Sequence, residues 1–251
     1  MTSIAWAADF QKGIEAHVKG DYSTALAEFE PLAKQGDVGA QFALGLMYER
    51  GEGVRQDYSK AVRWYRKAAE KGYVGAQLNL GVKYENGLGV PQDDSKAATW
   101  YRKAAKKGYA DAQFNLGIMY DNGQGVPQDK SRAATWYHKA AEQGHVYAQF
   151  NLGSKYFKGE GVPQDDSKAA TWYRKAAEKG YSDAQYNLGR MYAKGKGLPQ
   201  DYVRAHMWSS LAASQGDTDA VANRDKLADH MTSEQIGEAE KLAREWAAEH
   251  R

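Results

Sequence analysis

Residues 37–72 read DVGAQFALGLMYERGEGVRQDYSKAVRWYRKAAEKG, and this stretch decides the fold because it is one copy of a 36-residue repeat. The glycine that closes the repeat falls on a regular series, Gly36, Gly72, Gly108, Gly144, Gly180 and Gly216. An alanine near the start of the repeat and a tryptophan in its second half keep the same spacing. Such periodicity is the signature of a solenoid, in which each repeat buries its apolar face against the next one.

The pattern inside one repeat predicts two helices. Apolar residues recur at helical spacing over residues 38–50, which we expect to form the first helix. A Gly-x-Gly loop follows, and in later repeats it contains a proline, which cannot continue a helix. We expect the second helix to begin near Asp57, a residue type suited to N-capping, and to end before Gly72. The chain is therefore predicted to be all-α, a right-handed superhelical α-solenoid of stacked antiparallel helix pairs.

The tryptophan column is the predicted core of this hairpin. Its members are Trp64, Trp100, Trp136 and Trp172. Small residues at Gly45 and Ala68 would let the helix backbones approach each other, with Trp64 and Tyr48 filling the space between them. We expect these tryptophans to be buried rather than available for stacking on a ligand.

The fixed columns carry a family resemblance. In residues 73–108 they are Ala76, Leu80-Gly81, Tyr84, Gly87, Gly89, Val90, Asp93, Ala97, Trp100-Tyr101, Ala104-Ala105 and Gly108. This series resembles the SEL-one-like repeat (SLR), a relative of the tetratricopeptide repeat (TPR) with a longer loop between its helices. The resemblance covers five repeats, 37–72, 73–108, 109–144, 145–180 and 181–216. It implies a TPR-like solenoid and an adaptor role.

The two ends depart from the repeat. Residues 9–36 have a shorter loop and are similar to an ordinary TPR unit, and residues 217–251 form a charged helical cap in which Thr232 is expected to start the last helix. Residues 1–8 contain Ala5-Trp6-Ala7, a small-x-small pattern like the end of a signal peptide. They are either the remnant of an export signal, which would place the protein in the bacterial periplasm or outside the cell, or a disordered terminus of a cytoplasmic protein.

Composition excludes several classes of function. Lysine and arginine number 34 against 32 acidic residues, so a net charge of +2 gives no general attraction to nucleic acid, and we expect no such partner. No apolar run approaches the roughly 20 residues that span a bilayer, so we expect no membrane insertion. The chain has no cysteine, which excludes disulfides, thiol catalysis and thiolate metal sites.

No catalytic, cofactor or metal site is predicted. The Gly-x-Gly of each loop, as at residues 51–53, lacks the third glycine and the preceding strand of a nucleotide-binding loop. The six histidines form no H-x-x-x-H pair. Serines recur near helix starts, where capping explains them better than nucleophilic catalysis does.

The first helices carry the candidate binding surface, because by resemblance to TPR proteins they line a concave wall. The candidate residues are Phe42, Glu49, Phe114, Asp121, Phe150, Lys155, Lys158, Tyr186, Arg190 and Lys194. The aromatic residues either pack between neighbouring repeats or lie partly exposed in a groove. The charged residues change from acidic to basic along the chain, which is either a solvated face or a gradient that a partner reads.

The function we expect is that of a non-catalytic protein–protein interaction scaffold or adaptor, which binds a protein or an extended peptide on its concave surface. An alternative is a cell-envelope module that binds carbohydrate or peptidoglycan fragments through exposed aromatic rings. A third is a β-lactamase-like hydrolase, since some cysteine-rich relatives have been linked to β-lactams. Their disulfide-paired helices cannot form in a chain without cysteine.

Overall fold

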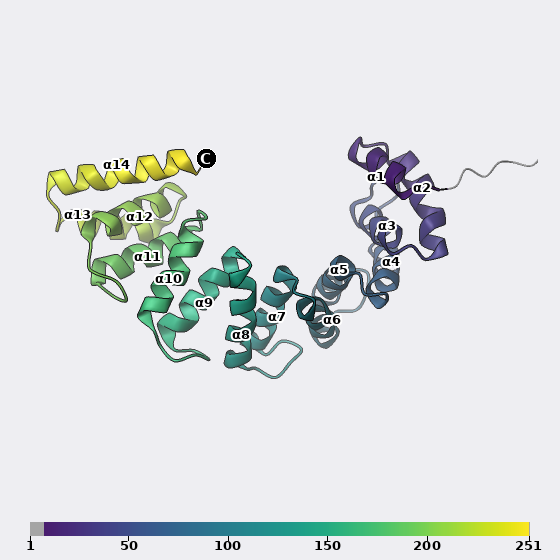
Figure 1. Ribbon diagram of the computed structural model, residues 1–251, viewed down its shortest axis with the longest axis horizontal. Helices are drawn as coiled ribbons and strands as arrows, with labels where there is room; N and C mark the ends of the chain where they lie inside the picture. Colours follow the sequence, from purple (N-terminus) through teal and green to yellow (C-terminus); the bar gives the residue numbers. More distant parts are fainter. Residues whose placement is uncertain (1–7, 251) are drawn as a thin grey trace, which may run out of the picture. The chain divides into compact units, whose positions relative to one another are not determined.

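Fourteen helices make up the regular structure of residues 8–250, the part of the chain that the computed structural model describes (Figure 1). Their bounds are α1 Phe10–Val18, α2 Tyr22–Gln35, α3 Val38–Arg50, α4 Tyr58–Glu70, α5 Val74–Asn86, α6 Asp94–Lys106, α7 Ala110–Asn122, α8 Lys130–Glu142, α9 Val146–Lys158, α10 Asp166–Ala177, α11 Ser182–Lys194, α12 Tyr202–Ser214, α13 Thr218–Ala228 and α14 Ser233–Glu249. The predicted all-α class is confirmed. The segment Ala5-Trp6-Ala7 lies outside the described residues.

The helices form two compact units, one ending at Gln128 and the other beginning at Asp129. The N-terminal unit contains α1–α7 and the C-terminal unit contains α8–α14. From α1 to α7 and from α8 to α13, helices that follow one another in the sequence pack side by side, whereas α14 packs on α12 (Figure 1). Each unit is therefore a stack of helix pairs, as the 36-residue period predicts.

Local capping fixes where the helices begin and end. Helix α3 has the predicted bounds, and Asp57 caps α4 by accepting a hydrogen bond from the Lys60 amide at 2.9 Å. The same cap recurs at Asp93, Asp129, Asp165 and Asp201. Gly72 follows α4 with a φ of +90°, a left-handed conformation that glycine adopts without a Cβ penalty.

The tyrosine beside each tryptophan, rather than the tryptophan itself, fills the centre of the hairpin. Tyr101 is fully buried whereas Trp100 is half-buried, and Trp172 is the one buried member of the four in the tryptophan column. Tyr101 packs on Gly81, where a Cβ would lie 2.5 Å from its ring. The neighbouring tryptophan points about 100° away around the helix. There Lys103 places its ammonium 3.9 Å from the centre of the Trp100 ring.

Buried glutamines join each hairpin to the one before it. The Gln77 side-chain amide donates to the carbonyl of Ala69 at 3.1 Å, across the junction of α4 and α5. Equivalent bonds, each spanning eight residues, are made by Gln41, Gln113, Gln149 and Gln185. Lysine side chains add bonds between repeats, since the Lys71 ammonium donates to the carbonyl of Gly36, 35 residues earlier, at 2.6 Å. These bonds fix the register of the stack.

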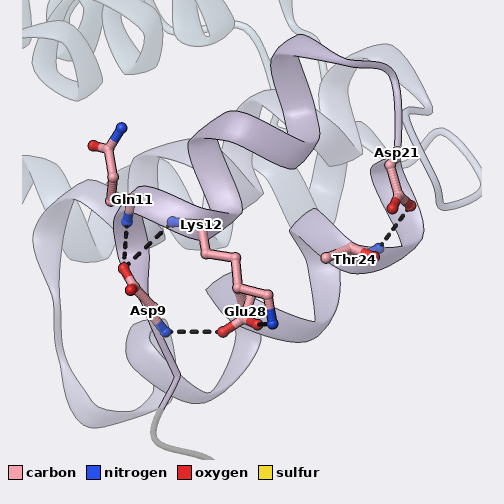
Figure 2. Close-up of polar contacts among 6 residues, drawn as sticks. All are labelled: Asp9, Gln11, Lys12, Asp21, Thr24 and Glu28. Atoms are coloured by element: carbon pink, nitrogen blue, oxygen red, sulfur yellow. Dashed lines mark hydrogen bonds and ion pairs between the residues drawn. The ribbon is translucent and has the colours of Figure 1, made fainter.

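Polar contacts hold the first helix on the second (Figure 2). Asp9 caps α1 by accepting from the amides of Gln11 at 2.8 Å and Lys12 at 3.3 Å. Glu28 of α2 accepts from the Asp9 amide at 2.8 Å and from the Lys12 ammonium at 2.5 Å. The Lys12 ammonium, followed by the Asp9 amide, lowers the pKa of the Glu28 carboxyl.

The C-terminal end is closed by a capped helix. Thr232 and Gln235 exchange side-chain to backbone hydrogen bonds in a capping box, which confirms the predicted start of α14 at Thr232. Trp246 of α14 packs edge-on against Trp208 of α12 with ring centres 5.9 Å apart. This contact places the last helix over the side of α12.

Candidate functional site

The aromatic candidates lie on the first helices, half-buried, and take part in packing between hairpins. Phe42 of α3 lies 4.8 Å from the Tyr73 ring, measured between centres. Phe150 of α9 contacts Tyr181 in the same way at 5.1 Å. Phe114 of α7 and Tyr186 of α11 are also half-buried, and Arg190 lies over the Tyr186 ring at 5.4 Å. Phe42 and Phe150 therefore pack against the next repeat, and all four aromatic candidates stay partly exposed.

The C-terminal unit exposes an aromatic patch of which the sequence analysis identified only Phe150. It consists of Tyr147, Phe150 and Tyr181, and Tyr147 is 54% exposed. The rings of Tyr147 and Tyr181 meet edge to face with centres 5.3 Å apart. Two features of the sequence could have predicted this patch. A tyrosine precedes several of the first helices, and Tyr147 stands at a position where the other repeats have glycine or aspartate.

The N-terminal unit has an apolar hollow in the corresponding region. Phe10, Ile14, Phe42, Leu46 and Tyr73 are among its lining residues. They come from α1, α3 and the residue preceding α5. No lysine, arginine, aspartate or glutamate is among the lining residues, so this hollow suits apolar side chains rather than charged ones.

The acidic candidate Glu49 is used inside the protein. Its carboxylate accepts a hydrogen bond from the Tyr65 hydroxyl at 2.5 Å and forms an ion pair with the buried ammonium of Lys83. Burial, followed by the bond to Glu49, raises the pKa of the Tyr65 phenol. Glu49 thus joins α3, α4 and α5 instead of presenting a free charge, which corrects the expectation from sequence.

Glu85 repeats this arrangement one repeat later. It accepts a hydrogen bond from the hydroxyl of Tyr101, whose pKa is raised by burial and then by this bond. Asp121 occupies the same column at the end of α7 and is half-buried. The acidic part of the expected gradient is therefore taken up by internal contacts at Glu49 and Glu85.

Lys155 is a second correction. Its side chain on α9 is buried, and its ammonium lies 2.8 Å from the Glu160 carboxylate. The Lys155 hydrogen bond and charge lower the pKa of Glu160, and the charge of Lys158 adds to the effect. Lys158 itself is exposed, as expected. Two lysines three residues apart on α9 thus have different roles, because Lys155 is buried in the packed part of the protein and Lys158 is exposed to solvent.

Arg190 and Lys194 are brought together in a small pocket of the C-terminal unit, which we call the basic pocket. Its lining residues are Phe157, Tyr173, Asn187, Arg190, Met191, Lys194 and Lys196. They come from α9, α10, α11 and the loop after α11. Lys196, which the sequence analysis did not select, lies over the Phe157 ring at 5.4 Å.

Tyr173 supplies a polar group to the basic pocket. Burial raises the pKa of the Tyr173 phenol to about 12, and the Ser154 hydroxyl and the Arg190 charge act in the opposite direction. At neutral pH this hydroxyl is therefore protonated and can donate a hydrogen bond. A donor beside three cationic side chains is an arrangement that suits an anion.

Among residues 8–250 no three histidine, aspartate or glutamate side chains come together in a way that could hold a metal ion. None of the helices in this part of the chain has the length and apolar character needed to cross a membrane.

Comparison with known proteins gives the family. The model of the Sel1 repeat matches residues 38–73, 74–109, 110–145, 146–181 and 182–217. Among solved structures the chain is similar to c5321, a protective antigen of uropathogenic Escherichia coli with an SLR fold, at 37% identity and a TM-score of 0.87 over 98% of this chain and 55% of that one. The chain thus spans about half the length of that antigen.

A second solved structure is similar along most of both chains. It is a Sel1 repeat protein from Oxalobacter formigenes, with 36% identity, a TM-score of 0.80 and coverage of 84% of this chain and 87% of that one. A search among curated proteins found no match. Five matched repeats over most of its length show that this chain belongs to the Sel1 repeat family, whose repeats are generally protein–protein interaction modules.

Proposed function

We propose that this protein is a non-catalytic scaffold that binds a protein or an extended peptide through the first-helix face of its C-terminal unit. One observation carries the proposal: Tyr147 is 54% exposed beside Phe150 and Tyr181, on the unit that also holds the basic pocket. Exposed aromatic side chains that form a cluster are typical anchors of protein interfaces.

The two parts of this surface would contribute differently to binding. The aromatic patch offers apolar area with little side-chain entropy to lose, because its rings already pack on one another. The cations Arg190, Lys194 and Lys196 would attract an acidic segment and orient it. Affinity would then depend mainly on the aromatic residues, and the rate of encounter and its salt dependence mainly on the cations.

Site-specific photo-crosslinking in the cells that make the protein tests this proposal. A photoreactive phenylalanine analogue replaces Tyr147 in one variant and Thr171 in a control variant. Thr171 is exposed on α10, the second helix of the same repeat. We expect a discrete protein adduct from position 147 and none from position 171. Adducts from position 171 alone, or equally from both positions, would place binding on another face.

A competition experiment with glycans distinguishes protein binding from carbohydrate binding. Peptidoglycan fragments are added as competitors during crosslinking at position 147. We expect no loss of the protein adduct, because the rings of the patch meet edge to face rather than lying flat beside one another. Loss of the adduct at low fragment concentration would favour the carbohydrate-binding alternative.

A further inference from the structure

A buried tyrosine of the N-terminal unit is satisfied by a carboxylate from the same chain. The Tyr101 hydroxyl of α6 donates to Glu85 at the end of α5, and the side chain of Asn115 from α7 also reaches this hydroxyl. Tyr65 is held in the same way by Glu49 and Asn79. Each such position thus contains a phenol, a glutamate and an asparagine from three successive helices.

The corresponding position of the C-terminal unit has lost the carboxylate. Tyr173 is equivalent to Tyr101 and Asn187 to Asn115, and both line the basic pocket. Phe157 stands where Glu85 stands in the other unit. Within residues 8–250, the Tyr173 hydroxyl has the Ser154 side chain as its hydrogen-bond partner, and no carboxylate contributes to the shift of its pKa.

Positive charge has been gained where the carboxylate was lost. At the Tyr101 position the residues equivalent to Arg190, Lys194 and Lys196 are Ile118, Asn122 and Gln124, and at the Tyr65 position they are Val82, Asn86 and Leu88. All six are uncharged. None of the three cations forms an ion pair with a carboxylate in the described part of the chain. The Arg190 guanidinium lies over the Tyr186 ring, a cation–π contact that uses none of its N–H donors.

We propose that the basic pocket binds the side-chain carboxylate of a glutamate from an extended acidic segment of a partner protein, in the place that Glu85 fills for Tyr101. This inference rests on the proposed function and specifies its ligand. The Tyr173 hydroxyl donates one hydrogen bond to the carboxylate, Arg190 donates a second, and Lys194 and Lys196 supply further positive charge. We assign the occupant as a glutamate because Glu49 and Glu85 accept this hydrogen bond from Tyr65 and Tyr101. The third repeat has the shorter Asp121 in this column.

Titration of the isotope-labelled protein with small probes, followed by NMR, tests the pocket directly. The probe is N-acetyl-glutamate N-methylamide, and the uncharged control is N-acetyl-glutamine N-methylamide. We expect saturable shifts of the Asn187 side-chain amide and the Arg190 guanidinium with the glutamate probe alone. Equal shifts with both probes, or none with either, would overturn the proposal. N-acetylglycine supplies a terminal carboxylate, and tighter binding of this probe would overturn the assignment to a glutamate side chain.

Variants borrowed from the second repeat sharpen the test. Arg190→Val and Lys194→Asn install the residues that this chain already uses at positions 82 and 86. Loss of a charge-assisted hydrogen bond in Arg190→Val should weaken probe binding by about 10-fold or more, and loss of the more distant charge in Lys194→Asn by less. Unchanged binding in Arg190→Val would contradict the proposed role of this residue.

A substitution that introduces a carboxylate of the chain itself into the pocket provides a second, independent test. Phe157→Glu restores the residue of the second repeat and should place a carboxylate of the chain itself beside Tyr173, which would abolish probe binding. Phe157→Gln is the control of the same shape without charge, and should keep most of the binding. If Phe157→Glu binds the probe as well as the native chain does, the pocket is not equivalent to the Glu85 position.

The outcomes separate this inference from the proposed function. Probe binding without any adduct at position 147 would support the carboxylate pocket and contradict the proposed protein-binding face. An adduct at position 147 that persists in Arg190→Val and Phe157→Glu, together with no probe binding, would support the face and contradict the pocket.

Discussion

The hairpins α5–α6 of the N-terminal unit and α9–α10 of the C-terminal unit have nearly the same sequence. They differ in whether the hydroxyl of the central tyrosine is hydrogen-bonded to a carboxylate of the chain. Residues 90–108 and 162–180 differ at a single position, Lys106 against Glu178. Yet Tyr101 donates to Glu85, whereas Tyr173 faces a pocket with Phe157 and cations. The difference lies in the first helices, so the second helix is a common scaffold and the last turn of the first helix decides whether the position is closed or open.

The largest expected effect tests the part that the two hairpins share. Tyr101→Ala removes a fully buried ring and should lower the free energy of unfolding by about 3–5 kcal/mol, the range for large aromatic truncations. Trp100→Ala should cost clearly less, because the Trp100 ring is half-buried. Urea unfolding followed by far-UV circular dichroism measures both. A larger loss of unfolding free energy for Trp100→Ala than for Tyr101→Ala would mean that the tryptophan, and not the tyrosine, is the central residue of the hairpin.

Overpacking at the helix crossing should have the next largest effect. Gly81→Ala would place a Cβ 2.5 Å from the Tyr101 ring, and we expect a loss of about 1–3 kcal/mol in unfolding free energy. Gly237→Ala on exposed α14 is the matched control, because no atom lies within 4 Å of its added Cβ. Alanine is the better helix former, so this control should stabilise the protein by about 0.5–1 kcal/mol. If Gly81→Ala and Gly237→Ala changed the free energy of unfolding in the same direction, close packing at Gly81 would be contradicted.

Removing one hydroxyl compares the closed and open positions directly. Tyr101→Phe deletes the hydrogen bond to Glu85 and should cost about 1 kcal/mol of unfolding free energy. Tyr173→Phe should cost a few tenths of a kcal/mol, because no carboxylate depends on that hydroxyl. Thermal or urea unfolding of the two single variants provides the comparison. Equal losses would mean that Tyr173 already has an internal partner as strong as Glu85.

Most of the fold follows from the sequence because its signals are local. The bounds of α3 and the cap at Asp57 depend on residues within one turn, so periodicity and residue type were enough to predict them. The choice between Trp100 and Tyr101 as the central residue was wrong. Neighbouring residues on a helix differ by about 100° in direction, and which of them meets Gly81 depends on how two helices cross.

The site could be predicted only in part, for the same reason. Arg190 and Lys194 are four residues apart on one helix, a spacing that places them on one face. The burial of Lys155 and the engagement of Glu49 involve partners from other helices or loops, which spacing along one helix does not reveal. The loss of the carboxylate at Phe157 is visible in the sequence, but its meaning requires Tyr173 to be placed opposite it.

The smallest effect concerns the ionisation of the two tyrosines at high pH. Burial raises the pKa of Tyr173 to about 12, and it raises the pKa of Tyr101 as well, where the Glu85 carboxylate adds to the rise. Both values lie above the pKa of about 10 for a tyrosine in an unfolded chain. The stability linked to Tyr173 is therefore fully present below about pH 10 and is lost as the pH rises from about 10 to about 12.

Phenolate absorbance distinguishes the two tyrosines while circular dichroism confirms that the protein stays folded. The difference between the native chain and Tyr173→Phe should show one phenolate forming near pH 12. The corresponding difference for Tyr101→Phe should show none over the same range, because the neighbouring Glu85 carboxylate opposes a second negative charge. Arg190→Val should move the Tyr173 transition to higher pH, since the Arg190 charge favours the phenolate. Ionisation of Tyr101 before Tyr173 would mean that the carboxylate acts at position 173, and the contrast between the closed and open hairpins would then be reversed.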